Sequence, residues 1–193
     1  MMKKYFIPLL FATVSLQAQT WTKQYDFVDD CICGLAKVSK QDKFGFVNKD
    51  GKLIVPLEYD EALAFNEGLA AVKKGNKWGY LDSTGKVVAE PRFEDAASFH
   101  DGLAAVKQSG KYGYINNSAV MVIHPEFDMA GRFSEGLAAV ANNKGQWGYI
   151  DEKGKIVIGF SYTFADIFTE GVARVMKGSA VKNIDRNGKE VRE

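Results

Sequence analysis

Paired aromatic residues with a glycine between them are the feature of this sequence that most suggests a binding chemistry. Exposed aromatic rings can stack on flat ligands such as sugars, whereas buried rings fill a core and remove about 150–250 Å² each from water. Solvent exposure distinguishes the two roles, because a ligand can reach only a ring that is at least partly accessible. The candidate ligand-stacking residues are Trp78, Tyr80, Tyr112, Trp147 and Tyr149.

Two cysteines and two histidines are the other side chains with reactive chemistry. Cys31 and Cys33 are separated by one residue, so a disulfide between them would close a small, strained ring. Zinc would need two further ligands, but His100 and His124 stand singly. Three interpretations of the cysteines stay open: small apolar residues in a strand, a strained redox pair, or an intermolecular bridge. We expect no metal site and no cofactor.

Motifs that are typical of enzymes fail in detail. The segment from Gly79 to Lys86 resembles a phosphate-binding loop, but five residues separate its glycines instead of the usual four. The Asp-x-x-Gly segments lack the alternating acids of a calcium loop. The acidic residues recur at fixed repeat positions, which is typical of a fold rather than of catalysis, so we predict that the chain is not an enzyme. A catalytic or inhibitory site would have to lie where the sequence departs from its repeat, at Cys33, His100, Arg132, Arg174 or Lys182.

The first 18 residues predict a secretory signal. A basic start is followed by an apolar stretch of roughly 12 residues and a small residue, Ala18, at the expected cleavage point. This stretch is too short for a membrane-spanning helix, which needs about 20 residues. We therefore expect residues 1–18 to be a signal peptide and residues 19–193 to form one exported domain, in the periplasm, at the cell surface or outside the cell. No transmembrane segment is expected after cleavage.

The charge of the chain is nearly balanced. Without the two lysines of the signal segment, the 25 Lys and Arg residues fall to 23, against 24 Asp and Glu. A balanced charge gives no electrostatic reason to bind nucleic acid, whose phosphates attract basic surfaces. We therefore expect no nucleic-acid partner.

An internal repeat of about 34 residues runs through the rest of the chain. Its first marker is a glycine, found at Gly34, Gly68, Gly102, Gly136 and Gly171. Its second marker is an aromatic residue followed by glycine, found at Phe44-Gly45, Trp78-Gly79, Tyr112-Gly113 and Trp147-Gly148. Five units begin near Tyr25, Tyr59, Phe93, Phe127 and Tyr162. A further aromatic position holds Phe65, Phe99, Phe133 and Phe168. Cys31 has this position in the first unit, so we expect it to replace a core phenylalanine.

Each unit is expected to form β-strands rather than helices. Glycines lie inside every apolar segment, where each would destabilise a helix by about 1 kcal/mol, whereas apolar and polar residues alternate with a period of two. The Asp/Asn-x-x-Gly segments, such as Asp82–Gly85, suit the type I turn with a left-handed glycine that closes short hairpins. Each unit is therefore predicted to contain three antiparallel strands: the aliphatic run after that turn, the Gly-Leu-Ala-Ala-Val segment and the aromatic-glycine segment.

One such unit is too small to form a core alone, so the units must stack on each other. We predict an all-β fold, a tandem array of five three-stranded antiparallel meanders that is open and solenoid-like; a closed, propeller-like arrangement is the alternative. Rings from neighbouring strands would cover the space beside each glycine and form a ladder, as in aromatic rescue. Lys37 and Arg174, which replace an alanine of the other units, are expected to meet solvent at the ends of the array.

The tryptophan-glycine segments resemble a known family. The segments 78–82 and 147–151, each preceded by Gly-Leu-Ala-Ala-Val, are similar to the WG (KWG) β-repeats of bacterial proteins. The resemblance covers about residues 25 to 190 and implies a β-repeat fold; it implies little about activity and supplies no catalytic residues. The departures are Phe44 and Tyr112 in the tryptophan position, and Val181-Lys182 where the fifth unit should have Trp-Gly.

These observations predict an exported scaffold that presents a repetitive β surface to a protein or to an envelope polymer, since repeat arrays bind through extended faces. The alternative is a module that binds glycans of the cell envelope through the repeated aromatic rings. The exposure of those rings separates the two hypotheses.

Overall fold

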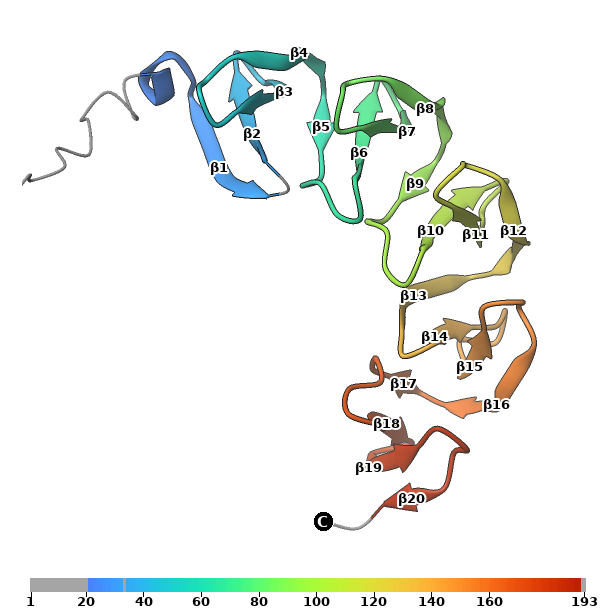
Figure 1. Cartoon of the computed structure of the whole chain (residues 1–193). Helices are drawn as coiled ribbons and strands as arrows, with labels where there is room; N and C mark the ends of the chain where they lie inside the picture. The colour runs from blue at the N-terminus through green and yellow to red at the C-terminus, as the bar shows by residue number, and fades with distance from the viewer. Residues whose placement is uncertain (1–20, 33, 192–193) are drawn as a thin grey trace, which may run out of the picture.

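A computed structural model describes residues 21–32 and 34–191 of the chain. In this part the protein is all-β, with five antiparallel sheets of four strands each, preceded by a short 3-10 helix, η2 (Trp21–Gln24). The sheets follow one another along an arc (Figure 1). Among the described residues, no helix is long and apolar enough to cross a membrane.

The strands of each sheet follow in chain order, and the sheets are numbered 1 to 5 from the N-terminus. Sheet 1 contains β1 (Phe27–Ile32), β2 (Leu35–Lys40), β3 (Lys43–Asn48) and β4 (Leu53–Tyr59). Sheet 2 contains β5 (Glu61–Ala62), β6 (Leu69–Lys74), β7 (Lys77–Asp82) and β8 (Val87–Phe93). Sheet 3 contains β9 (Asp95–Ala96), β10 (Leu103–Gln108), β11 (Lys111–Asn116) and β12 (Met121–Phe127). Sheet 4 contains β13 (Met129–Ser134), β14 (Leu137–Ala141), β15 (Trp147–Asp151) and β16 (Ile156–Tyr162). Sheet 5 contains β17 (Phe164–Ala165), β18 (Val172–Lys177), β19 (Ala180–Asp185) and β20 (Glu190–Val191).

The prediction of an all-β fold is confirmed, but the prediction of three strands in each unit is wrong. The three predicted strands are present, and each sheet has a fourth strand at its start. In sheet 2 this is β5, where only Glu61 and Ala62 pair with β6. A two-residue strand is too short to show an alternating pattern, so the sequence carries no signal for it.

The extra strand comes from the way the chain passes between sheets. The chain bends at Asp60, directly after β4, and continues into β5 of the next sheet (Figure 1). The last strand of one sheet and the first strand of the next are therefore nearly one extended segment. The same crossing joins the other neighbouring sheets, because a single residue separates their strands in each case.

Neighbouring sheets pack face to face and form the core between them. We call the face that a sheet turns to the next sheet its forward face, and the opposite one its backward face. Tyr80 and Phe93 on the forward face of sheet 2 pack with Phe99 and Val106 on the backward face of sheet 3. The rings of Tyr80 and Phe99 meet edge to face, with centroids 5.1 Å apart. Equivalent clusters fill the other three spaces between sheets.

The predicted closed ring, the alternative arrangement, is not what Figure 1 shows: the first and last sheets lie apart at the two ends of the arc. No sheet in the described part combines strands from both ends of the chain. Among residues 21–32 and 34–191, no sheet therefore neighbours the backward face of sheet 1 or the forward face of sheet 5.

Each end of the arc is finished in its own way. At the N-terminal end, Trp21 takes the repeat position that Val55 has 34 residues later. Its side chain lies against Gly51, as that of Val55 lies against Gly85. Trp21 also packs with Tyr25 over the backward face of sheet 1. At the other end the prediction for Arg174 is confirmed, since 63% of its side chain is exposed. The prediction for Lys37 is wrong: only 18% of its side chain is exposed. Lys37 forms an ion pair with Asp29 at 3.2 Å, and its Nζ lies 5.7 Å from the ring centroid of Phe27.

Candidate functional site

The glycine beside each signature aromatic residue is required by a close approach of backbone. A Cβ atom at Gly45 would lie 2.5 Å from the carbonyl oxygen of Val55, and one at Gly148 would lie 2.6 Å from that of Ile158. The outer strand bulges at this point, which brings its carbonyl against the glycine. The expectation that a neighbouring ring covers an empty space there is wrong, because a carbonyl group occupies the space.

The tyrosine after that glycine links one sheet to the next. The hydroxyl groups of Tyr80, Tyr114 and Tyr149 donate hydrogen bonds of 2.7–2.8 Å to the carbonyl oxygens of residues 97, 131 and 166 in the following sheet. All three side chains are buried, and a buried hydroxyl without such a partner would destabilise the fold. Sheet 1 has Phe46 in this position. This side chain packs on Phe65 of sheet 2 by its ring alone.

These tyrosines predict a loss of stability at alkaline pH. Burial raises the pKa of Tyr80, Tyr114 and Tyr149, and burial followed by the hydrogen bond to Asp95 raises the pKa of Tyr112 to about 12. A folded-state pKa above the unfolded value of about 10 stabilises the fold fully below pH 10, and this stabilisation is lost as pH rises through the folded value. In a titration above pH 10, we expect tyrosinate absorbance to increase over the same pH range in which the circular dichroism signal of the β-sheets is lost. Ionisation of these four tyrosines near pH 10 while the protein stays folded would contradict this.

The five candidate stacking residues differ in exposure. Tyr80 and Tyr149 are fully buried, and Trp78 is 7% exposed. Tyr112 and Trp147 are half-buried. Trp78, Tyr112 and Trp147 have the same place in successive sheets, next to the outer strand. Three of the five rings are thus closed to a ligand, and two present part of their surface.

Acidic residues of the repeat bind the backbone of neighbouring turns. The carboxylate of Glu67 accepts a hydrogen bond of 3.0 Å from the backbone amide of Gly102, and that of Glu135 accepts one of 3.0 Å from Gly171. Asp101 continues this series with an oxygen 3.3 Å from the amide of residue 136. These carboxylates link each hairpin to the equivalent hairpin of the next sheet.

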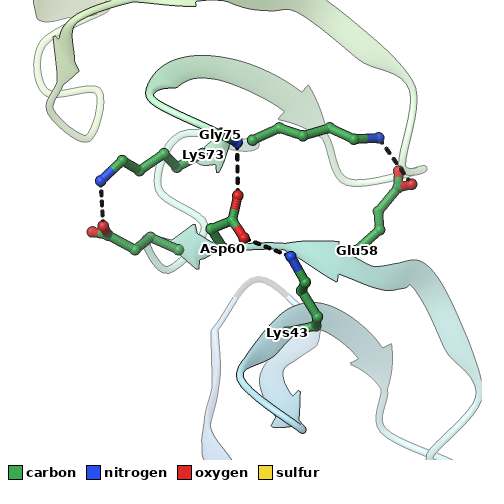
Figure 2. A network of polar contacts seen from close by, with 7 residues as sticks. Lys43, Glu58, Asp60, Lys73 and Gly75 are labelled. Carbon is green, nitrogen blue, oxygen red and sulfur yellow. Dashed lines mark hydrogen bonds and ion pairs between the residues drawn. The ribbon is translucent and has the colours of Figure 1, made fainter.

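Asp60 links sheets 1 and 2 at the crossing between them (Figure 2). Its carboxylate accepts hydrogen bonds from Lys43 Nζ at 2.5 Å and from the backbone amide of Gly75 at 2.7 Å. These bonds, that of Lys43 first, lower the pKa of the Asp60 carboxyl group. Glu94 binds the amide of Gly110 at 3.0 Å in the same way in sheet 3. The position is therefore structural.

The cysteine and histidine positions do not form a common site in the described residues. The prediction that Cys31 replaces a core phenylalanine is wrong, because Cys31 is exposed. The equivalent Phe65 packs against the preceding sheet, whereas no sheet of the described residues precedes that of Cys31. Cys33 lies outside the described residues. In the described part, no group of three or more His, Cys, Asp or Glu side chains is placed to hold a metal ion.

The other departures from the repeat are scattered. His100 lies near Asn66 of the preceding sheet, with nitrogen atoms 3.4 Å apart, and Arg132 is exposed on β13. Arg174 faces Asp166 at 4.0 Å, and Lys182 pairs with Glu190 at 2.5 Å. These residues come from different sheets or bind separate partners, so they do not converge on one pocket.

Sheets 4 and 5 carry an exposed apolar surface where sheets 2 and 3 carry charges. In sheet 2, Glu61 lies opposite Lys73 and binds it at 2.5 Å; Lys73 is labelled in Figure 2. In sheet 3 the same pair is Asp95 and Lys107. The equivalent pairs are Met129 with Ala141 in sheet 4 and Phe164 with Met176 in sheet 5.

We call the large side chains of this surface the apolar row, which consists of Met129, Trp147, Phe164, Met176 and Val181. Met129 is 53% exposed, Phe164 39% and Val181 59%. Trp147 and Met176 lie beside these positions in the neighbouring strands and are half-buried. Of these, sequence reasoning singled out Trp147 alone. A comparison of the positions of Glu61 and Lys73 across the five units would have found Met129, Phe164 and Met176.

The repeat can now be compared with known proteins. The family model described as "WG containing repeat" matches residues 44–78, 78–112, 112–145 and 147–179. This chain belongs to the WG-repeat family. The predicted resemblance is thereby confirmed. The matched segments begin at or near the tryptophan position of successive units, so the WG-repeat model accommodates Phe44 and Tyr112 there.

Solved structures share the fold of this WG-repeat protein at low sequence identity. The computationally designed protein Ika8 matches with a TM-score of 0.56 and 15% identity, over 84% of this chain and 60% of that one. BamB from Moraxella catarrhalis matches with a TM-score of 0.54 and 14% identity, over 86% and 59%. Hsv2 from Kluyveromyces lactis matches with a TM-score of 0.53 and 15% identity, over 82% and 59%. No curated protein matches the chain.

The WG-repeat chain spans about three fifths of the length of these structures. The neighbours are β-propeller-like, so the four-stranded sheets of this WG-repeat protein resemble propeller blades.

Proposed function

We propose that this WG-repeat protein is an exported scaffold without catalytic activity, and that its open array of five units binds a partner protein. The apolar row is the observation that supports this most. Its exposed side chains lie on two rigid neighbouring sheets, at positions where sheets 2 and 3 have charged pairs. Large apolar surface that a partner removes from water stabilises a complex by about 25 cal/mol per Å².

A protein partner fits the row better than a charged polymer does. Met129, Phe164 and Val181 offer flexible and aliphatic surface as well as one aromatic ring, and methionine adapts its shape to irregular apolar partners. Export is a prediction from residues 1–18, which lie outside the described residues.

A double variant, Phe164→Glu with Met176→Lys, places in sheet 5 the charged pair that sheet 2 carries at Glu61 and Lys73. We expect the fold to persist and the dissociation constant for the partner protein to rise at least about tenfold, because charges would be buried in the interface. The partner is captured from solubilised envelope protein with the wild type, purified, and titrated by calorimetry.

Val120→Glu is the matched control, because Val120 is 57% exposed and lies outside the apolar row. This variant is expected to bind the partner like the wild type. Equal binding by the wild type and the double variant would contradict the role of the row.

Sugar binding is the second candidate, and the half-buried ring of Trp147 favours it. Lys73 lies over the ring of Trp78, with its Nζ 5.8 Å from the centroid, whereas Ala141 takes that place beside Trp147. Of the candidate rings, Trp147 and Tyr112 present surface to a sugar. Purified envelope polysaccharides that bind the wild type and the Phe164/Met176 variant, but not Trp147→Ala, would favour this function over protein binding.

A further inference from the structure

Strand β16 has an outer edge that differs from the equivalent edges of the preceding sheets. The strands β4, β8, β12 and β16 each end the order of their sheet, so one edge of each pairs with no strand of that sheet. Proline interrupts the first three, at Pro56, Pro91 and Pro125. In β16 the equivalent residues are Gly159 and Phe160. Proline lacks the N–H group that an added strand would bind, and it is a common protection of sheet edges.

The side chains of β16 are also unlike those of the other outer strands. Its sequence, Ile-Val-Ile-Gly-Phe-Ser-Tyr, carries no charge, whereas β4 contains Glu58, β8 contains Glu90 and Arg92, and β12 contains Glu126. Ile156 is 51% exposed and Val157 is 42% exposed. Charges and prolines keep edge strands from pairing with other chains, and β16 has neither.

A groove lies beside this strand, between sheets 3 and 4. It has a volume of about 270 Å³ and is lined by Ile156 and Phe160 of β16, by Glu126 and Phe127 of β12, and by residues of neighbouring turns and strands. A strand that pairs with β16 would place every second side chain on this side of the sheet. The groove, which Lys111, Asn142 and Asn143 also line, offers room for one such side chain.

We propose that β16 pairs in antiparallel fashion with β16 of a second copy of this chain. In a twofold antiparallel pair, residues near the strand centre face themselves or their close neighbours. A charged strand would therefore meet its own charge, which is unfavourable for directly opposed residues. An uncharged strand such as β16 avoids this repulsion. The pairing joins the two copies of sheet 4 into one eight-stranded sheet and covers Val157 and Ile156. It is independent of the apolar row.

The test uses two substitutions that the protein itself tolerates at equivalent positions. Phe160→Pro imitates Pro91 and Pro125, and Gly159→Pro imitates Pro56. Sedimentation of the full mature chain, from nanomolar to high micromolar concentration in reducing buffer, measures dimer formation without a contribution from cysteine bridges. We expect the wild type to dimerise and both proline variants to weaken the dimer at least about a hundredfold. Circular dichroism of the variants should match that of the wild type.

Val157→Lys is the second variant, in case a proline disturbs the fold. Its side chain is exposed, so the monomer should be unaffected, whereas the pairing would cover the lysine with the uncharged β16 of the second copy. Gly159→Ala is the control that keeps the backbone N–H, and it should dimerise like the wild type. Hydrogen exchange should show that the amides of β16 become protected as the dimer forms.

Three results would overturn the proposal. The first is a wild-type protein that stays monomeric at all concentrations, even if its β16 pairs with a strand of another protein. The second is a dimer that survives Phe160→Pro, Gly159→Pro and Val157→Lys. The third is growth of fibrils in place of a discrete dimer.

Discussion

Replacing Gly113 by alanine is expected to lower the free energy of unfolding by about 3 kcal/mol or more, which is at the upper end for overpacking. The new Cβ atom would overlap the backbone carbonyl oxygen of Ile123 and would also lie 2.8 Å from the nitrogen of Pro125. Both neighbours are backbone atoms of the bulged outer strand and cannot rotate away. Urea unfolding followed by circular dichroism measures the effect.

Gly159→Ala is the matched control for Gly113→Ala. Gly159 also lies in a β-strand of the repeat, but a Cβ atom there would meet no other atom within 4 Å. Alanine should change stability by no more than about 0.5 kcal/mol. If the two variants are equally stable, close backbone approach is not the reason for glycine beside the signature aromatic residue.

Replacing Phe133 by alanine is expected to destabilise the protein by about 3–5 kcal/mol. This side chain is 1% exposed, and its ring lies 4.8 Å from that of Tyr114, centroid to centroid, across the space between sheets 3 and 4. Alanine would leave a cavity between two sheets that keep their distance through other contacts. Thermal and urea unfolding measure the loss.

Cys31→Ala probes the same repeat position at the end of the arc. Cys31 corresponds to Phe133 in the sequence repeat, but it is exposed because none of the five described sheets precedes its own. We expect a change within about 0.5 kcal/mol. A large loss of stability for Cys31→Ala, or a small one for Phe133→Ala, would contradict the stacking of the sheets described above.

Positions that recur in every unit could be predicted, and positions defined by a neighbour could not. The turn at Asp82–Gly85 follows from local chemistry, and Gly85 has the expected positive φ of 86°. The environment of Cys31 depends instead on whether a sheet precedes it, which the repeat pattern does not state. The low exposure of Lys37 could not be predicted for a similar reason, since it accompanies an ion pair with Asp29 of the neighbouring strand β1.

The candidate surfaces illustrate the same limit. The motif drew attention to residues that recur, such as Tyr80 and Tyr149, and these proved to be buried because they hold the sheets together. The apolar row consists largely of residues that do not recur, such as Phe164 in the position of Glu61. In a repeat protein the shared residues report on the fold, and surfaces specific to one chain lie among its deviations.

Because the chain passes directly from β4 into β5, neighbouring sheets are connected in series when the protein is stretched. A pull on the two ends of the protein is transmitted along these crossings (Figure 1). A sheet cannot detach without loading the strand that continues into its neighbour. Each sheet that yields would release a unit of about 34 residues, or about 120 Å of extended chain. The end sheets have one neighbour and the inner ones have two, so the array should extend stepwise from its ends.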